Sequence, residues 1–352
     1  MTSVTTGPRH LAELGSPAGG FAGRALASGR VIDAGQWTSD GAILGLVREA
    51  GYLWGTVRDV ETGDIVSLMR RVPPPSSFAA EGADPKTALS GKLIIMSTHD
   101  GAGALRVRRE PKGAVDSRQI FRSVAPGGVR FLSADGTSGR SFDLSLSPER
   151  LAYMEEGTVA LHGTLACPAL QWFLPGADAA LLYLTQTWEV SGTVLGREVR
   201  GFLFWEEAYM YPGARLYVSK DPLHDVRYTT WYSWANRYGD GTTEVGHFLF
   251  GQDDFHVGVV ASSDGRVQVA KRMDAVVRRD SEGYWHDGLD YTLDGEAWIC
   301  EPDPRGRMEL GPIPNPQQEG RIRRRGEKRD IDVWMAWGET VPKNGDSRRS
   351  DR

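Results

Sequence analysis

The chain has 352 residues, a net charge of −5 and 25% charged residues, which is typical of a water-soluble globular protein. The negative net charge argues against a nucleic-acid partner, and no run of about 18 apolar residues predicts a membrane-spanning helix. The length exceeds that of most single hydrophobic cores, so we expect two domains or one large double-lobed β structure.

The N-terminus and the cysteines exclude several further classes. The first residues show no basic start followed by a continuous apolar core, so we expect no signal peptide and a cytoplasmic location. Cys167 and Cys300 could form one disulfide bridge, but we expect them to be reduced and buried. The sequence contains no CxxC motif, no paired-histidine spacing, no P-loop and no GxGxxG after a strand. We therefore predict neither a metal nor a cofactor.

The first half of the chain predicts short strands joined by tight turns. Glycine is abundant, at 43 residues, and turn sequences recur at short intervals. Hairpins are predicted over residues 51–72, 92–110 and 131–146. Three consecutive prolines place residues 72–92 in an exposed loop, because proline cannot join a hydrogen-bonded ladder. Residues 147–156 are expected to form at most a short helix or a turn.

The pattern is clearer after residue 183. Hairpins are predicted over 183–209, 229–251, 255–273 and 289–302, and a closing strand over 330–341. The first of these hairpins turns at Leu195-Gly196-Arg197. Sustained helical periodicity is nearly absent from the whole chain. We therefore predict an all-β fold of barrels or sandwiches built from antiparallel hairpins.

Both ends of the chain are polar, and one run of residues is strongly basic. We expect residues 1–28 and 341–352 to be disordered. The run RIRRRGEKR, residues 321–329, is open to two interpretations. It binds an acidic group, or it is a solvated edge strand or loop whose charges prevent edge-to-edge pairing. We favour the second interpretation.

The segment GFLFWEEAYMYPG, residues 201–213, combines aromatic rings with two adjacent carboxylates. Side chains alternate along a strand, so this segment has two sets of residues that face opposite ways. The sets are Leu203, Trp205, Glu207 and Tyr209, and Phe202, Phe204 and Glu206. Both begin with apolar residues, so we expect the strand to be covered on both sides. At most one glutamate then faces a given cavity, which counts against the facing carboxylates of a glycosidase.

Two interpretations of Glu206 and Glu207 are open. In the first, the strand emerges into solvent at the glutamates and the charges mark its end. In the second, the inward-facing glutamate lies against aromatic rings, where lost hydration raises its pKa and makes it a candidate general acid near neutral pH. Glu206 is the first candidate, and Glu207 replaces it if the register of the strand shifts by one residue.

A second aromatic strand follows at residues 229–238. Its two faces carry Trp231, Ser233 and Ala235, and Tyr232, Trp234 and Asn236. These rings either fill a core or line a pocket that offers apolar area and a few polar tips. His247 lies on the next predicted strand, on one face with Val245 and Leu249. It is either a core histidine or part of a catalytic site.

Three segments resemble a known family. They are VSGTVLGREVRGFLFWEEAYMYPG, WYSWANRYGDGTTEVGHFLFG and DVWMAWGETV, which follow one another between about residues 150 and 340. In this order they resemble the lipocalin-like superfamily of hydroxyneurosporene synthase, a carotenoid hydratase, which includes AttH-like proteins and fungal Diels–Alderases. That group has a Gly-x-Gly-x-x-Asp-His-x-Trp-Gly pattern and a late strand that ends in Gly-x-x-Glu-like sequence.

The pattern is matched only in part. Gly201 matches the first glycine, Glu206 takes the acidic position, and Gly338-Glu339 resembles the closing signature. The other positions differ: Leu203 replaces the second glycine, Glu207 the histidine, Tyr209 the tryptophan and Met210 the last glycine. The Asp-His pair is therefore absent, and the resemblance bears on the fold more than on the chemistry.

The resemblance implies two packed lipocalin-like lobes, which we place at residues 29–212 and 213–340. It also implies a lipophilic substrate, held between the lobes or in the mouth of one, and chemistry without a redox cofactor or a metal. The residues predicted to bind this substrate are Trp205, Tyr209, Tyr211, Trp231, Tyr232, Trp234 and Asn236. The predicted catalytic residues are Glu206, Glu207 and His247.

These observations support three hypotheses. The first is an enzyme that cyclises, isomerises or hydrates an unsaturated apolar metabolite such as a terpenoid, polyene or polyketide. The aromatic rings would stabilise developing positive charge and shape the reactive conformer. The second is a non-catalytic carrier of the same ligand class. The third is a carbohydrate-active β protein, which the adjacent glutamates and the expected lack of a signal peptide disfavour.

Overall fold

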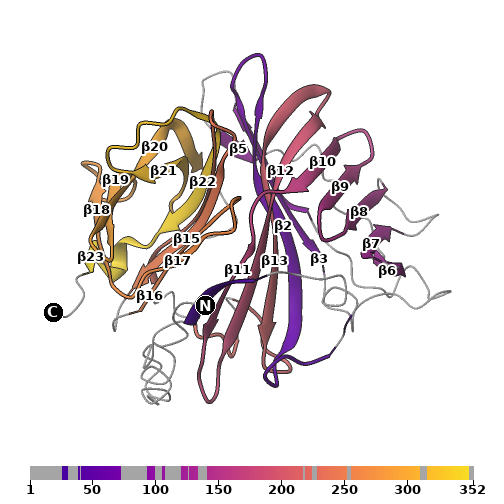
Figure 1. Ribbon diagram of the computed structural model, residues 1–352, viewed down its shortest axis with the longest axis horizontal. Helices are drawn as coiled ribbons and strands as arrows, with labels where there is room; N and C mark the ends of the chain where they lie inside the picture. The colour runs from indigo at the N-terminus through magenta and orange to yellow at the C-terminus, as the bar shows by residue number, and fades with distance from the viewer. Residues whose placement is uncertain are drawn as a thin grey trace.

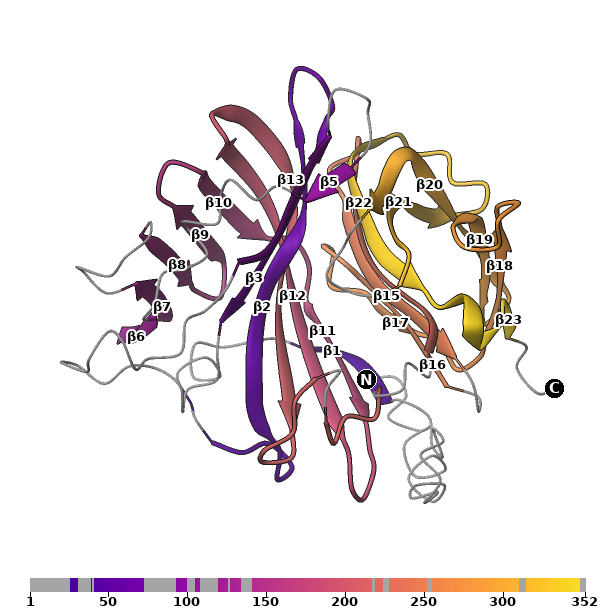
Figure 2. The same ribbon diagram turned by 180° about the vertical axis from the view of Figure 1, so that it is seen from behind.

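The computed structural model describes residues 26–30, 39, 41–72, 93–99, 105–107, 120–125, 127–133, 141–216, 219–223, 228–251, 255–309 and 315–348. The described strands form one hydrogen-bonded sheet that curls into two antiparallel half-barrels (Figures 1 and 2). The predicted all-β fold of two lipocalin-like lobes is therefore confirmed.

The first lobe carries its long strands in the middle. Its strand order is β6–β7–β8–β9–β10–β12–β13–β2–β3–β4–β5. In addition, β11 pairs with the first half of β12, and β1 pairs with β11. The bounds are β1 Leu26–Arg30, β2 Val47–Asp59, β3 Ile65–Val72, β4 Leu93–His99, β5 Leu105–Val107, β6 Ile120–Ala125, β7 Gly128–Ser133, β8 Phe142–Leu146, β9 Arg150–Glu155, β10 Val159–Leu165, β11 Ala169–Leu174, β12 Leu181–Val194 and β13 Arg197–Met210.

The second lobe has the strand order β17–β16–β15–β14–β22–β21–β20–β19–β18–β23. The bounds are β14 Tyr228–Tyr238, β15 Thr243–Gly251, β16 His256–Ser262, β17 Val267–Val269, β18 Met273–Arg279, β19 His286–Leu293, β20 Glu296–Glu309, β21 Gln317–Arg324, β22 Ile331–Thr340, η3 Pro342–Asn344 and β23 Ser347–Arg348. A short parallel pairing of β20 with β5 joins the lobes. The predicted boundary at residues 212 and 213 falls between β13 and β14.

The predicted hairpins of the second half are confirmed. The pairs β12–β13, β14–β15, β16–β17 and β19–β20 are antiparallel neighbours. In the β12–β13 turn, Leu195 and Gly196 both have positive φ angles, of 52° and 77°. This is the backbone geometry of a two-residue hairpin turn that matches the twist of the flanking strands. The turn fixes the register that later brings the site together.

The lobes pack against each other through the outer faces of their sheets. Each lobe keeps its own apolar interior, and a third cluster of buried residues is shared between the lobes. We call this shared layer the seam. Its central side chains are Trp54, Trp172, Tyr183, Phe204, Glu206, Trp231, His247 and Trp337. The alternation predicted for β13 and β14 is confirmed, because one face of each strand lies in the seam and the other in a lobe interior.

Several local predictions are wrong. Residues 150–155 form β9 rather than a short helix or turn, because burial alternates along them with a period of two. Leu26–Ser28 belong to β1, and η3 and β23 lie beyond residue 341, so disorder is wrong for these parts of the two ends. β21 pairs with both β20 and β22, so an edge strand is wrong for residues 321–324, whereas residues 325–329 lie in a loop, the other form predicted for this run. Its arginines bind the protein's own carboxylates, such as Glu301 and Glu296.

Predictions were also made for the two cysteines, the proline-rich stretch and membrane-spanning helices. Cys167 and Cys300 are free and buried, as expected. The proline-rich stretch 73–92 lies outside the described residues. Within the described ranges, no helix has the length and apolar character needed to cross a membrane.

Candidate functional site

Glu206 is the central polar group of the seam. It is 2% exposed and projects from β13 beside Phe204, on the face that meets the second lobe. The Tyr183 hydroxyl donates a hydrogen bond to its Oε2, and the Thr185 hydroxyl lies 3.4 Å from its Oε1. The turn at residues 195–196 makes this possible, because it places Thr185 directly opposite Glu206 and Tyr183 opposite Ala208.

His247 reaches the same point from the second lobe. It is fully buried on β15, and its Nε2 lies 3.7 Å from Glu206 Oε1. The indole Nε1–H of Trp172 donates to His247 Nδ1 at 3.2 Å. Nδ1 is therefore an acceptor, and the ring proton of the neutral imidazole is on Nε2, facing the carboxyl group. Nε2 has no hydrogen-bond partner among the described residues.

The electrostatics of this pair follow from burial. Loss of hydration raises the pKa of Glu206 to about 7, and hydrogen bonds from Tyr183, Trp54 and Thr185 oppose the shift without cancelling it. Burial lowers the pKa of His247 to about 3, so the imidazole is neutral near pH 7. No arginine or lysine among the described residues forms an ion pair with Glu206. Both groups are therefore uncharged over part of the neutral range.

Aromatic rings enclose the pair. Trp172 stacks on Tyr183 with 5.0 Å between ring centroids, and Trp231 meets their edges at 5.6 and 5.3 Å. On the other side, Trp54 stacks on Phe204 at 5.0 Å. The expected dry hollow is thus occupied by the protein's own rings. The expected acidic side chain is turned into these rings and away from solvent.

Glu207 lies on the opposite face of β13, inside the first lobe. Arg48 Nη2 is 3.3 Å from Glu207 Oε1, and both side chains are buried. Trp205 Nε1 and the Tyr209 hydroxyl also donate to the Glu207 carboxylate, at 3.3 and 3.0 Å. Glu207 is therefore an ion-paired anchor of the first lobe and does not contact the Glu206–His247 pair.

The structure divides the predicted substrate-binding residues among several places. Trp231 lines the seam beside Tyr183. Trp205 and Tyr209 accompany Glu207 in the first lobe, and the Tyr211 hydroxyl donates to the Gly176 carbonyl. Tyr232 and Trp234 fill the interior of the second lobe. Asn236 also lies on their face of β14, where its amide donates to the Ile322 carbonyl at 2.6 Å.

Four side chains that contact Glu206 or His247 were not predicted: Trp54, Trp172, Tyr183 and Thr185. For two of them the sequence holds a signal. A two-residue turn at Leu195-Gly196 fixes the pairing of the strands, and counting back from it places Thr185 opposite Glu206, with Tyr183 two residues further on the same face. Trp172 lies on β11 opposite Tyr183 of the adjacent β12, but no local pattern indicates its contact with His247. Trp54 lies on β2, far away in the sequence, and no local pattern indicates its partner.

Among the described residues, no group of three or more His, Cys, Asp or Glu side chains is placed to hold a metal ion. The chemistry that the seam can perform with its own side chains is proton transfer by Glu206. His247 Nε2–H and the Tyr183 hydroxyl are positioned to stabilise the carboxylate that this transfer leaves.

Comparison with known proteins places the chain as follows. No protein-family model and no curated protein matches its sequence. A crystal structure of a candidate AttH from Nitrosomonas europaea is similar, with a TM-score of 0.45 and 15% identity, over 89% of this chain and 97% of that chain. Kievitone hydratase from Nectria haematococca has a TM-score of 0.37 and 9% identity, over 83% of this chain and 89% of that chain. AttH-like proteins are among those that the sequence resembles.

Proposed function

We propose that the protein is an enzyme that protonates a lipophilic unsaturated metabolite in the seam, without a cofactor, and that Glu206 is the proton donor. A single observation supports this most strongly. Glu206 is a buried carboxyl group with neutral neighbours, and its pKa is raised to about 7. Such a group holds a proton at neutral pH and is acidic enough to release it.

The proposed reaction begins when Glu206 transfers its proton to a C=C bond or to a conjugated carbonyl oxygen of the substrate. The positive charge that develops on the substrate lies beside the faces of Trp172 and Trp231, which stabilise it by cation–π attraction. The Tyr183 hydroxyl donates to the carboxylate that remains, and His247 Nε2–H faces it from 3.7 Å. Transfer of a different substrate proton to the Glu206 carboxylate then gives isomerisation. Attack by a second double bond, followed by the same proton transfer, gives cyclisation. Addition of water, with transfer of one water proton to Glu206, gives hydration, and each outcome restores the neutral acid.

The substrate class follows from the lining of the seam. The surfaces around Glu206 are indole and phenyl rings, which bind flat, apolar and unsaturated molecules. Terpenoids, polyenes and polyketides have this chemistry. Because Glu206 is 2% exposed and His247 is fully buried, a substrate reaches them only when side chains of the seam move apart.

A lipophilic carrier is the second candidate, because the aromatic side chains of the seam offer an apolar surface whether or not a proton is transferred. A carrier uses the same apolar surface without a proton transfer. The two functions are separated by comparing turnover and binding in Glu206→Gln. Mass spectrometry of the molecule that copurifies with the protein identifies the ligand for both assays.

An enzyme loses turnover in Glu206→Gln and keeps the quenching of tryptophan fluorescence by the ligand. If the wild-type protein binds the ligand and never changes its mass or its isomer, the proposal is wrong and the carrier function replaces it. Quenching by oligosaccharides, with no response to polyenes, would contradict both functions.

A further inference from the structure

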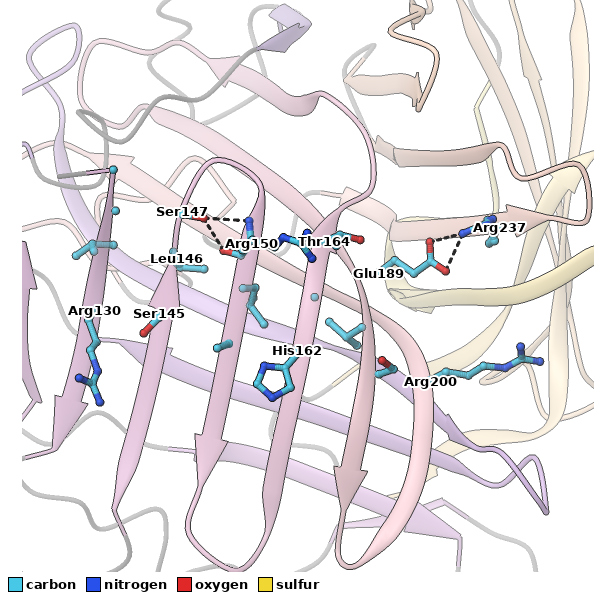
Figure 3. Close-up of a pocket in the computed structure, with 18 of the residues that line it drawn as sticks. Arg130, Ser145, Leu146, Ser147, Arg150, His162, Thr164, Glu189, Arg200 and Arg237 are labelled. Atoms are coloured by element: carbon cyan, nitrogen blue, oxygen red, sulfur yellow. Dashed lines mark hydrogen bonds and ion pairs between the residues drawn. The ribbon is translucent and has the colours of Figure 1, made fainter. Parts of the chain in front are cut away.

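A cavity of about 1110 Å³ lies at the edge of the seam, on the outer face of the sheet of the first lobe (Figure 3). We call it the groove. Strands β7–β10, β12 and β13 form its floor, and Arg237 and Val333 of the second lobe close one end. None of its lining residues contributes to the interactions of Glu206 described above. The groove therefore needs a separate explanation.

The register of the sheet explains why this surface is hollow. Neighbouring strands each contribute one side chain to a row across the groove, and the strands are about 4.8 Å apart, so the row is about 24 Å long. The row consists of Arg130, Ser145, Ala152, His162, Ser191 and Arg200. Its two ends carry long arginines, and three of the four positions between them carry short side chains. The short side chains leave the depression between the ends.

The charge of the groove is opposite to that of the chain. The net charge of the protein is −5, yet four arginines and one glutamate line the groove. The glutamate, Glu189, is already neutralised by Arg237 of the second lobe, whose Nη1 lies 3.0 and 2.8 Å from its carboxylate oxygens. Arg130 is paired with Asp143.

Arg150 and Arg200 are the other two arginines that line the groove. Both are exposed, and neither forms an ion pair with any residue that the structure describes. Figure 3 shows His162 and Thr164 between the side where Arg130 and Arg150 lie and the side where Arg200 and Arg237 lie. Two unpaired guanidinium groups on either side of a hydroxyl-lined depression create a positive potential that an anion would relieve.

We propose that the groove is a binding site for a small-molecule oxyanion, a carboxylate or a phosphate, held by Arg150 and Arg200. A guanidinium group can donate two parallel hydrogen bonds to such an anion. The hydroxyl groups of Ser145, Thr164 and Ser191 can add neutral hydrogen bonds from the floor. At about 1110 Å³ the groove is large enough to hold a small molecule. This proposal does not depend on the function proposed for Glu206.

Isothermal titration calorimetry at low ionic strength tests the proposal with three probes: inorganic phosphate, dodecanoate and dodecanol. We expect phosphate or dodecanoate to bind the wild-type protein and dodecanol to bind at least tenfold more weakly. Binding of phosphate without dodecanoate assigns the site to phosphates, and the reverse assigns it to carboxylates with an apolar chain. Failure of both anions to bind overturns the proposal, as does equal binding of dodecanoate and dodecanol.

The arginines are tested by the double variant Arg150→Gln/Arg200→Gln. It should weaken binding of the anion by about tenfold or more, because both guanidinium groups that donate charge-assisted hydrogen bonds are lost. Arg272→Gln is the matched control: Arg272 is exposed on the second lobe, outside the groove, and its loss should leave affinity unchanged. If a single variant of the groove, Arg150→Gln or Arg200→Gln, weakened binding of the anion no more than Arg272→Gln does, the effect would be one of general charge, and the proposed site would be wrong.

Glu189→Gln gives an independent result of opposite sign. It removes the one carboxylate that lines the groove and frees Arg237, so affinity for the anion should rise several-fold. Unchanged or weaker binding in Glu189→Gln contradicts the proposal, even if the double arginine variant fails to fold. Glu206→Gln should bind the anion as the wild-type protein does. A negative result for the anion site can therefore be distinguished from a negative result for the proposed catalytic role of Glu206.

Discussion

Glu206 and Glu207 are neighbours in sequence and are each 2% exposed, yet they lie on opposite faces of β13 in unlike surroundings. Glu207 faces the interior of the first lobe, with Arg48 at 3.3 Å. Glu206 faces the seam, where its partners Tyr183 and His247 are neutral. Two carboxyl groups that are equally buried can therefore have different roles. The charge of the neighbours decides whether such a group is an ion-paired anchor or a group that can hold and release a proton.

The largest expected effect is the loss of turnover when Glu206, the glutamate of the seam, is replaced. Glu206→Gln keeps the volume and the hydrogen-bonding capacity of the side chain and removes the acidic proton. We expect turnover of the copurifying ligand to fall by roughly 10²–10⁴-fold, the usual contribution of a general acid. Initial rates of product formation measure the loss. Wild-type rates in this variant would remove Glu206 from the reaction.

The second effect is a loss of stability when Glu207, the glutamate of the first lobe, is replaced. Glu207→Gln removes the carboxylate that lies 3.3 Å from the buried Arg48, and loss of one partner of a buried ion pair costs about 3–5 kcal/mol. Chemical denaturation should show this loss of unfolding free energy, while the turnover of the protein that remains folded stays near that of the wild type. A stable Glu207→Gln that has lost its activity would exchange the roles of the two glutamates.

The third prediction concerns pH. The pKa of Glu206 is about 7 in the folded protein and ordinarily 4.5, so its contribution to stability is complete below pH 4.5 and is lost as the pH rises to about 7. His247 contributes with the opposite sign, because its pKa is lowered. Glu155 and Glu319 also have raised pKa values, of about 7.

The difference in unfolding free energy between the wild type and Glu206→Gln removes these shared contributions. We expect this difference, wild type minus variant, to fall by up to about 3 kcal/mol between about pH 4.5 and pH 7, at about 1.4 kcal/mol for each unit of the pKa shift. Denaturation curves at several pH values provide the measurement. A difference that stays constant across this range would show that Glu206 ionises as it does in water.

The smallest expected effect sharpens the role of His247 as a positioning residue. His247→Phe leaves the Trp172 indole N–H buried without its acceptor, which should cost about 1–3 kcal/mol of unfolding free energy. It also removes the Nε2–H that faces Glu206, so the alkaline limb of the pH–rate profile should move to higher pH. A purely structural role for His247 would reduce stability without moving that limb.

Much of this arrangement could be predicted from the sequence. The alternation of side chains predicts that Glu206 and Glu207 face opposite ways, and it separates Trp231 from Tyr232, Trp234 and Asn236. The second half of the chain has clear turns, so its hairpins are correctly predicted. The strand β9 was missed because Ser147 and Pro148 suggest a turn, while the apolar residues Leu151 and Tyr153 are too few to establish a period.

The partners of the two glutamates could not be predicted in the same way. Arg48 is on β2 and reaches Glu207 only because β2 pairs with β13. His247 reaches Glu206 only because two curled sheets pack through their outer faces, and no turn or local period encodes that contact. The sequence therefore identified the candidate acid, and only the structure shows that its surroundings are neutral.

The central claim is that Glu206 is protonated in the folded protein near neutral pH. Infrared difference spectra between the wild type and Glu206→Gln test it directly, because a protonated carboxyl group has a C=O stretching band that disappears on ionisation. This band should be present at pH 6 and should be lost with a midpoint of about 7. A band that is absent at pH 6, or lost near pH 4.5, would contradict it.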